Sequence, residues 1–418
     1  MTDETCPYAI DTAGRDIHGE AAQLRARGRA TQVELPGGVV TWWVTDQVLL
    51  KELLIDPRVS RDTYRHWPAW ENGESELAKT WPLAMWVSDR NMITAYGTDH
   101  RRLRKLVAKA FTARRSAALR PRIEEITTEL LDRIAALPPG QPVDLRQEFA
   151  YPLPTQVISE LLGIPDSIRG DLLKAVSRML DTSSDAGQAK ANELELYRLL
   201  DALVAIKRES PEDDLTSELI AVRDDGGAGL SERELVDTVL LMFTAGHETT
   251  VNLLDQAVYA LLGHPEQLAM VLGGDVPWED AIEEVLRLEA PFANLPMRYA
   301  VEDIELDDLT IAKGEPIVVS FAAAGRDPGV HGATADAFDV TRATRREHVA
   351  FGHGVHHCVG APLARLEASI GLPALFARFP RLRLAQPAES IEPLGSFVSN
   401  GHRGLPVLLG ADIPVGAR

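Results

Sequence analysis

A glycine-rich segment near the C-terminus holds the residues best suited to metal or redox chemistry. Positions 351–362 read FGHGVHHCVGAP. A helix is predicted to begin directly after Cys358, because Pro362 is well tolerated in a first helical turn. A sulfur at that position faces unsatisfied backbone N–H groups and the positive end of the helix dipole, and both stabilise a thiolate. The glycines permit tight turns and leave room for a flat ligand to approach.

Three interpretations of Cys358 are compatible with this segment. Taken alone, it is most simply a structural cysteine in a glycine-rich loop. It can instead join His353, His356 and His357 in a zinc site, although ligands so crowded rarely complete a tetrahedron, and the sequence has no second cluster of Cys and His. The third interpretation is an axial thiolate of a haem iron, an arrangement that favours O–O bond cleavage.

The segment 245–250, AGHETT, is the second candidate for chemistry. The small residues Ala245 and Gly246 leave space for a diatomic ligand beside a helix. The hydroxyl of Thr249 can bond to the carbonyl of Ala245, four residues back, which competes with the helix ladder and opens a bulge that admits water. Glu248 would then feed protons to that water. Without further context, a glycine and two threonines in a helix most often serve helix–helix packing.

The two segments together resemble the motifs of one family. The pattern Phe-x-x-Gly-x-His-x-Cys-x-Gly is filled at every position in 351–360 and resembles the haem-binding signature of the cytochrome P-450 superfamily. AGHET at 245–249 is similar to the superfamily's Ala-Gly-x-Asp/Glu-Thr motif and precedes the cysteine in the expected order. The resemblance extends over nearly the whole chain. The segments 81–83 (WPL) and 144–150 (DLRQEFA) look closest to the actinomycete family numbered 154.

This resemblance implies a haem-thiolate monooxygenase that contains haem b, with Cys358 as the iron ligand. Such an enzyme inserts one oxygen atom of O2 into a C–H bond of a hydrophobic small molecule. The residues expected to act on the oxygen side are Thr249, Glu248, Ala245 and Gly246. The alternative is a haem-thiolate enzyme that couples rings or isomerises its substrate. A non-enzymatic haem sensor is weaker still, since a sensor needs no proton path.

Residues around the haem also acquire roles from the resemblance. His100 and Arg104 lie four positions apart, hence on one helix face, and in bacterial relatives this spacing binds a haem propionate. Arg298 and His356 match two further propionate positions, and charge-assisted bonds to carboxylates suit these side chains. Without the resemblance, an exposed basic face would be the simplest interpretation of His100 and Arg104. The other cofactor contacts expected in the cysteine segment are Phe351, Gly352 and Gly360.

Glu284 and Arg287 form an i, i+3 pair on a predicted helix. Most such pairs are solvated and contribute little stability. The resemblance to the superfamily's Glu-x-x-Arg motif implies a buried structural role instead, with Arg342 as the third partner.

A substrate pocket above the haem is a further implication of the resemblance. The residues expected to line it are Met85, Trp86, Val87, Met179, Leu241, Met242, Phe292, Ala293, Asn294, Leu295, Phe397 and Val398. These side chains are apolar or neutral, which suits a polyketide, terpenoid, steroid or hydrophobic peptide. The choice of these compound classes comes from the family analogy alone.

A run of basic residues interrupts an otherwise acidic chain. Between His100 and Arg120 there are eight Lys and Arg residues and no acid: Arg101, Arg102, Arg104, Lys105, Lys109, Arg114, Arg115 and Arg120. The simplest interpretation is a solvated helix face. The functional interpretation is a docking patch for an acidic electron donor, where complementary charge raises the association rate. The resemblance implies a small ferredoxin and a ferredoxin reductase, and the chain has no flavin or NAD fingerprint of its own.

Composition narrows the cellular setting. The formal net charge of −19 argues against general binding to nucleic acid or to an anionic membrane surface. The two cysteines, Cys6 and Cys358, do not suggest a disulfide scaffold. We find no signal-peptide pattern at the start and no apolar run of the roughly 18 residues that a membrane span needs. We therefore expect a cytoplasmic protein, and the resemblance implies a monomer.

The elements predicted to position these side chains are mainly helical. Helical patterns cover about 100–137, 155–162, 166–181, 187–208, 277–289 and a stretch directly after Cys358. The longest pattern runs from Ser231 to about Leu262 and opens with a capping box of Ser231 and Glu234. At 1.5 Å per residue this helix would be about 48 Å long, enough to cross a whole domain. Because much of its circumference is apolar, we expect it to be buried.

The remaining patterns indicate a smaller β portion. A hairpin is expected at about 32–45, turning at Pro36-Gly37-Gly38, followed by a short helix that Asp46 caps and that stops at Pro57. Short strands fill 297–320. The predicted fold is mainly α with a minor β region, the cytochrome P-450 fold, with the long helix over the haem and the cysteine loop beneath it. We expect one domain, 1–418, with its helix-rich core at about 100–290 and 358–380 and its β-rich portion at about 30–60, 297–320 and 382–410.

Overall fold

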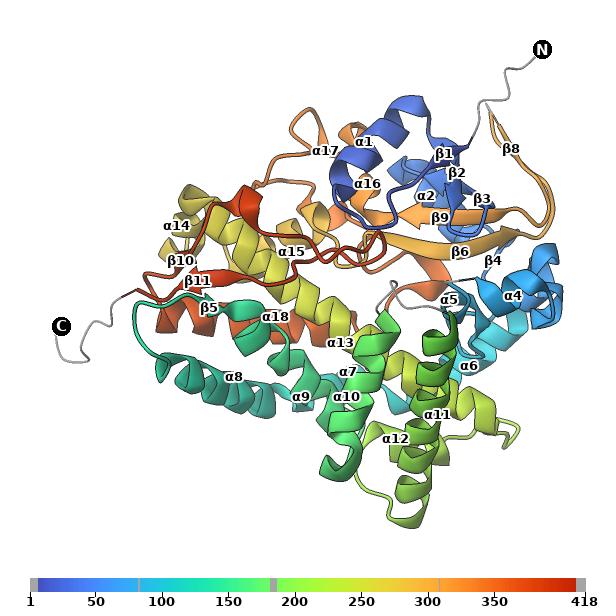
Figure 1. Ribbon diagram of the computed structural model, residues 1–418, viewed down its shortest axis with the longest axis horizontal. Helices are drawn as coiled ribbons and strands as arrows, with labels where there is room; N and C mark the ends of the chain where they lie inside the picture. The colour runs from blue at the N-terminus through green and yellow to red at the C-terminus, as the bar shows by residue number, and fades with distance from the viewer. Residues whose placement is uncertain (1–6, 82, 181–185, 308, 411–418) are drawn as a thin grey trace.

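The computed structural model describes residues 7–81, 83–180, 186–307 and 309–410. Cys6 and Pro82, which belong to patterns discussed above, lie outside these ranges. Within them, helices make up most of the molecule and the strands gather in small sheets (Figure 1), which confirms the predicted fold class. The assignment of the whole chain to one domain stays a prediction.

The longest helix in the described ranges is α13, Glu232–Gly263. Ser231 caps it through the predicted capping box with Glu234, and the helix ends before Pro265. Most of its side chains are buried, and it crosses the middle of the molecule (Figure 1). The helices packed around it are α9 (Pro152–Leu161), α11 (Ala186–Glu209), α15 (Trp278–Leu288) and α18 (Ala361–Arg378).

The helical pattern predicted over 100–137 forms three helices. They are α6 (Gly97–Ala110), α7 (Ala113–Ala118) and α8 (Arg120–Ala135). The first break falls at Thr112, whose hydroxyl accepts a hydrogen bond of 3.1 Å from the N–H of Arg115. Threonine offers the backbone this alternative to the helix ladder, so α7 starts afresh with its own cap.

The other helices follow the predicted patterns or add short connections. α10 (Asp166–Leu180) and α11 match the predicted ranges, whereas α12 (Leu215–Ala221) and α14 (Pro265–Gly273) were not expected. The shorter helices are α1 (Ile17–Arg27), α2 (Gln47–Ile55), α3 (Thr63–His66), η1 (Pro68–Gly73), α4 (Glu76–Thr80), α5 (Met85–Ser88), η2 (Arg146–Ala150), α16 (Phe321–Gly325), α17 (Pro328–His331), η3 (Arg345–Glu347), η4 (Gly354–His356) and η5 (Ala388–Ser390).

The main sheet contains the predicted hairpin. Strands β2 (Ala30–Leu35) and β3 (Val39–Val44) are antiparallel, and the turn uses positive φ at Gly37 and Gly38. The strand order of this sheet is β1-β2-β3-β9-β6-β4. Its remaining strands are β1 (Tyr8–Ala9), β9 (Pro316–Ser320), β6 (Asn294–Ala300) and β4 (Val59–Ser60). Asp46 caps α2 as predicted.

Two small sheets complete the β portion. One pairs β7 (Ile304–Glu305) with β8 (Thr310–Ile311). The other has the order β10-β11-β5, formed by Arg383–Leu384, Pro406–Leu408 and Val143–Asp144. The second sheet therefore joins the C-terminal part of the chain to the segment that precedes η2, beside α18 (Figure 1).

Glu284 and Arg287 on α15 are completely buried and paired, with Arg287 Nη2 2.7 Å from Glu284 Oε1. Arg342 reaches the same carboxylate oxygen at 3.2 Å. Arg287 also donates to the main-chain oxygens of Gly325 and Ala335. This cluster ties α15 to the segment that leads to the cysteine loop.

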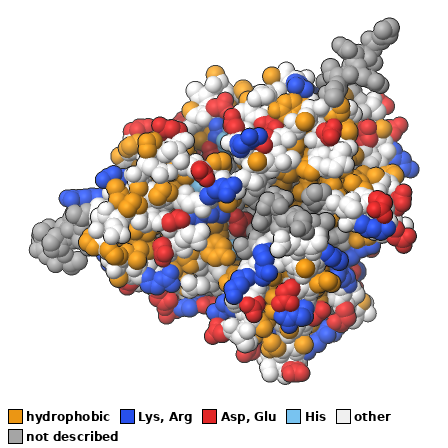
Figure 2. All heavy atoms as spheres, in the orientation of Figure 1, with side chains coloured by type: hydrophobic (Ala, Val, Ile, Leu, Met, Phe, Trp, Pro, Cys, Tyr) orange, Lys and Arg blue, Asp and Glu red, His pale blue; other side chains and the backbone are white. Residues whose placement is uncertain are grey.

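One face of the molecule is mixed in charge (Figure 2). On the face shown in Figure 2, acidic and basic side chains lie interspersed among apolar ones. Among the helices that the structure describes, none combines the length and the apolar composition needed to cross a membrane.

Candidate functional site

Cys358 lies between η4 and the start of α18. Its N–H donates to the main-chain oxygen of Phe351 at 2.8 Å, which closes the loop. Gly352 and Gly354 both have positive φ. A Cβ on Gly354 would lie 2.7 Å from Ile55 Cγ2 and 3.0 Å from the main-chain oxygen of Leu54. The loop therefore packs directly on α2, and the glycines are required for that approach.

The sulfur of Cys358 occupies the position expected from the sequence. Burial raises the pKa of the thiol, while hydrogen bonds from the N–H groups of Gly360 and Ala361 lower it, as do the charges of Arg104 and Arg365. Many protein atoms lie around Cys358, yet the residue is exposed. The sulfur thus faces open space inside the molecule and is supplied with donors that favour the thiolate.

Four of the predicted cofactor contacts come together beside the loop. The rings of His100 and His356 lie 4.2 Å apart. Arg104 Nη2 donates to the main-chain oxygen of His357 at 2.7 Å. Three buried polar atoms have no hydrogen-bond partner: His100 Nε2, His356 Nδ1 and Arg298 Nη1. Within the described part of the chain, no carboxylate pairs with any of these four side chains.

The charges and the burial of His100, Arg104, Arg298 and His356 favour the binding of an anion beside them. Burial lowers the pKa of Arg298 well below its usual value, and the charge of Arg61 lowers it further. Burial, with the charges of Arg104 and Arg101, lowers the pKa of His100 to about 4. Buried positive groups without acidic partners are costly unless a ligand supplies the negative charge. The cluster fits a ligand that carries carboxylates, as the propionates of haem do.

Arg61 belongs to the same cluster and was missed in the sequence. It follows β4, is only 5% exposed, and its pKa is lowered to about 10 by burial. Its charge also lowers the pKa of His356. No local pattern distinguished it, because the neighbouring basic groups lie far away in the chain.

On α13, the predicted bond is present: Thr249 Oγ1 donates to the main-chain oxygen of Ala245 at 2.5 Å. Ala245 is exposed although most of the helix is buried, so α13 borders open space at this point. Gly246 faces α9 and not this open space. A Cβ there would lie 3.0 Å from Ile158 Cδ1, so the glycine permits close packing against α9.

Glu248 has a partner that local sequence patterns did not indicate. Arg146, on η2, places Nη2 2.9 Å from Glu248 Oε1. Burial raises the pKa of Glu248, whereas Arg146 lowers it. The proton affinity of this carboxylate is thus set by its burial together with the charges around it, of which Arg146 is the first.

The residues expected to line a substrate pocket divide into two groups. Trp86, Leu241, Phe292 and Leu295 are partly exposed, and the rings of Trp86 and Phe292 meet edge to face at 6.1 Å. The others with described side chains are buried in the core: Val87, Met242, Ala293, Asn294, Phe397 and Val398. Met85 lies on α5 and Met179 on α10, and their side chains are outside the described part of the structure.

The basic run over 100–120 is largely paired within the molecule. Arg102 pairs with Glu234, Lys105 and Lys109 with Asp225, Arg115 with Asp213, and Arg120 with Glu124. In the described ranges, Arg101 and Arg114 are the members of the run without an acidic partner or a contact to the cysteine loop.

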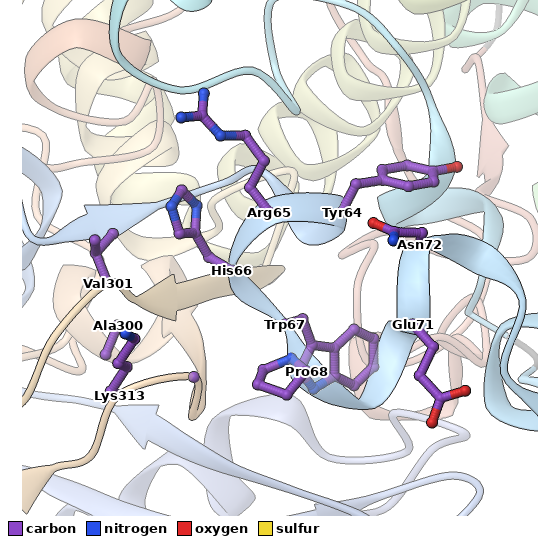
Figure 3. Close-up of a pocket in the computed structure, with 11 residues that line it drawn as sticks. Tyr64, Arg65, His66, Trp67, Pro68, Glu71, Asn72, Ala300, Val301 and Lys313 are labelled. Carbon is purple, nitrogen blue, oxygen red and sulfur yellow. The ribbon is translucent and has the colours of Figure 1, made fainter.

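Possible metal-binding groups and surface pockets bear on other functions of this chain. Among the described residues, no group of three or more His, Cys, Asp or Glu side chains is placed to hold a metal ion, which disfavours the zinc interpretation. A surface pocket of about 250 Å³ lies between the α3–η1 segment and the end of β6 (Figure 3). His66, Trp67 and Lys313 help to line it, and it contains none of the predicted site residues.

Comparisons with known proteins point to one family. The family model described as Cytochrome P-450 matches residues 198–272 and 278–400. The chain is 44% identical over 404 residues to 2-hydroxy-5-methyl-1-naphthoate 7-hydroxylase of Streptomyces carzinostaticus, covering 97% of this chain and 98% of the relative.

Two solved structures are similar over almost their whole length. CYP154A1 from Streptomyces coelicolor A3(2) has a TM-score of 0.90 and 54% identity, covering 96% of this chain and 100% of that one. The "testerone bound" CYP154C4 from a Streptomyces species has a TM-score of 0.92 and 46% identity, covering 97% and 99%.

The fold and the family together define a haem-iron oxidoreductase. The chain belongs to the cytochrome P-450 superfamily, close to its family 154, and is a cytochrome P-450 monooxygenase.

Proposed function

We propose that this monooxygenase holds haem b through the thiolate of Cys358 and inserts one oxygen atom of O2 into a C–H bond of a hydrophobic small molecule. The observation that carries the assignment of the site is that His100, His356 and Arg298 each keep a buried nitrogen without a hydrogen-bond partner among the described residues, next to a sulfur that accepts two backbone N–H groups. When bound, the haem iron supplies O2 activation, and thiolate ligation favours O–O cleavage.

The chain's own residues then divide the remaining work. The N–H groups of Gly360 and Ala361 stabilise negative charge on the sulfur. His100, Arg104, Arg298 and His356 hold the two propionates by charge-assisted bonds. Arg61 joins them as an additional positive charge.

Thr249 and Glu248 serve proton delivery in this proposal. The hydroxyl of Thr249 is fixed by Ala245, so its oxygen lone pairs can accept a hydrogen bond from a water molecule on the open side of α13. Glu248, one residue earlier in the same helix, exchanges a proton with that water. Ala245 leaves the space that the oxygen molecule needs.

The substrate class follows from the partly exposed apolar residues and from the relatives. Trp86, Leu241, Phe292 and Leu295 suit a hydrophobic molecule. One relative is named for the hydroxylation of a naphthoate, and a related structure contains "testerone". We assign to this chain a steroid, polyketide, terpenoid or peptide natural product as substrate.

Electrons come, in this proposal, from a ferredoxin and its reductase in the cytoplasm, and the enzyme acts as a monomer. Arg101 lies on α6, the helix that Arg104 joins to the cysteine loop, and its charge is free to meet an acidic donor. The intramolecular ion pairs narrow this docking proposal from the whole basic run to Arg101 and Arg114.

The decisive test is the absorption spectrum of the purified protein. Wild type should carry haem, and its reduced form should give the red-shifted carbon monoxide band of thiolate ligation. Cys358→Ala should lose that band. A Cys358→Ala protein that keeps the band, or a wild type that neither carries nor takes up haem, overturns the assignment.

A further inference from the structure

One face of α13 continues the polar character of Glu248 toward the C-terminal end of the helix. Asn252 and Asp255 follow at spacings of four and three residues, so all three side chains share that face. The guanidinium of Arg146 contacts each of them. Its Nη2 is 2.9 Å from Glu248 Oε1, and its Nη1 is 3.0 Å from Asn252 Oδ1 and 3.4 Å from Asp255 Oδ2. One buried cation therefore serves two carboxylates.

Asp255 is held more firmly than Glu248. It is fully buried, and its Oδ2 accepts hydrogen bonds from both the main-chain N–H and the ring Nδ1 of His402, each at 2.9 Å. The preceding Gly401 makes this approach possible, since a Cβ there would lie 2.5 Å from Asn252 Oδ1. Asp255 and the backbone around it thus form a fixed anchor for one side of Arg146.

The small sheet β10-β11-β5 positions both partners. Pairing of Pro406 with Asp144 and of Val407 with Val143 brings the segment after His402 next to the segment before Arg146 (Figure 1). The contact between Arg146 and α13 is therefore set by strand register, because β5 leads directly into η2.

The charges do not balance within this group. Glu248 and Asp255 together carry two negative charges against the single permanent positive charge of Arg146, and His402 adds a second positive charge only when its ring is protonated, so one proton can be accommodated. The groups facing Glu248 are Arg146, Asp255, Asn252 and Tyr151. Burial raises the pKa of Glu248, Arg146 and the bond from Asn252 lower it, and Asp255 raises it.

We propose that Asp255, anchored by His402, is a positioning residue that keeps Arg146 shared between two carboxylates and thereby leaves Glu248 able to take up and release a proton. The inference rests on the proposed role of Glu248 in proton delivery. An arginine given entirely to Glu248 would form a bidentate pair and hold the carboxylate ionised. Without Arg146, burial would keep Glu248 protonated. Sharing Arg146 between the two carboxylates keeps the proton affinity of Glu248 between these two limits.

The test compares Asp255→Asn with Arg146→Gln in the holoenzyme. Asp255→Asn removes a negative neighbour and frees Arg146, so the pKa of Glu248 should fall by about one unit or more. Arg146→Gln removes the positive neighbour, so the same pKa should rise. Infrared difference spectroscopy follows the protonated carboxyl band of Glu248, identified by its loss in Glu248→Gln. The pH dependence of coupling, product formed per electron consumed, should move in the same two directions.

Opposite shifts support the inference, and shifts in the same direction, or none, overturn it. His402→Gln is the milder variant in case Asp255→Asn does not fold, because it keeps the main-chain N–H bond; it should lower the Glu248 pKa by less. Asp214→Asn is the matched control, since Asp214 is a buried carboxylate paired with buried Lys207 at 2.8 Å, away from α13's polar face. It should destabilise the fold without moving the Glu248 band.

A second comparison separates this inference from the proposed function. In a Glu248→Gln background, Asp255→Asn should add no further loss of coupling. If Glu248→Gln alone leaves coupling unchanged, the proton role of Glu248 is wrong, whatever the infrared titration gives. If Glu248→Gln uncouples the enzyme but Asp255→Asn and His402→Gln leave the carboxyl band in place, the proposed function stands and the role of Asp255 is wrong.

Discussion

Arg104 Nη2 donates a 2.7 Å hydrogen bond to the main-chain oxygen of His357, the residue directly before Cys358. One side chain therefore connects α6 to the cysteine loop and also belongs to the basic cluster proposed to bind the propionates. Retention of haem and the position of the loop should depend on it together.

Arg104→Leu should loosen the haem. The change removes a charged hydrogen bond, which typically contributes about 1.5–3 kcal/mol, and one proposed propionate contact. The rate of haem transfer to apomyoglobin measures the effect. Arg101→Leu, an exposed position on the same helix, is the control and should lose haem at the wild-type rate. Equal rates for the two variants would remove Arg104 from the haem site.

Gly354→Ala should disrupt the cysteine loop more than an ordinary strained glycine would. The new Cβ would meet Ile55 and the backbone of Leu54, in addition to the unfavourable positive φ. Gly38→Ala is the matched control, because Gly38 also has positive φ but has no neighbour within 4 Å of its Cβ position. Haem content per protein should fall strongly for Gly354→Ala and stay near wild type for Gly38→Ala. A similar haem content in both would show that the close approach to α2 is unimportant.

Thr249→Ala should uncouple electron consumption from product formation. Its hydroxyl is the group proposed to place water beside the oxygen site, so its loss should increase hydrogen peroxide at the expense of product. Thr250→Ala is the control, since that hydroxyl bonds to Gly246 on the side packed against α9. Peroxide and product are measured per electron consumed. Full coupling in Thr249→Ala would contradict the assigned role.

Arg101→Glu should slow reduction by a ferredoxin at low salt. Arg101 makes no ion pair within the described residues, so the substitution changes the surface charge without breaking an internal contact. Arg102 is less suitable for this test, because it pairs with the Glu234 that caps α13. Stopped-flow reduction measures the rate, with Arg383→Glu on β10 as a charge-matched control, because Arg383 is also exposed and has no ion pair within the described residues. A rate identical to that of the control would exclude Arg101 from the docking surface.

His331 should make stability fall in mild acid. Burial, with the charges of Arg287 and Arg342, lowers its pKa from 6.5 to about 4, while its ring bonds to Thr344 and Gln47. Because the folded value lies below the unfolded one, the neutral ring stabilises the fold fully above pH 6.5, and this contribution is lost as the pH falls from 6.5 toward about 4. Urea denaturation across this range should show a smaller decline for His331→Asn than for wild type. An equal decline would assign the acid sensitivity to other groups.

The sequence was sufficient where the signal was local. The capping box of Ser231 and Glu234, the turn at Gly37 and Gly38, and the bond from Thr249 to Ala245 each depend on residues a few positions apart. The helical periodicity over 100–137 did not reveal the break at Thr112. A threonine that caps a helix cannot be distinguished in the sequence from a threonine inside one.

The rest depended on contacts between distant segments. Arg146 on η2 contacts Glu248 on α13, and Arg61, which follows β4, is close enough to Arg298 on β6 for its charge to lower the pKa of that residue. Neither relation can be recognised from the spacing of residues in the sequence. In the sequence, the basic run has no acidic partner nearby, because Asp225 and Asp213, which pair with Lys105 and Arg115, come more than ninety residues later.

Those ion pairs connect α6 and α7 to the segments before and after α12, and their acidic partners, Asp213 and Asp225, are exposed. Each contributes about 0–1 kcal/mol and weakens as the ionic strength rises. A salt titration of electron-transfer kinetics would therefore act on the enzyme's own scaffold as well as on its encounter with a donor. The two effects can be separated by repeating the titration with a small uncharged reductant, whose approach salt does not screen.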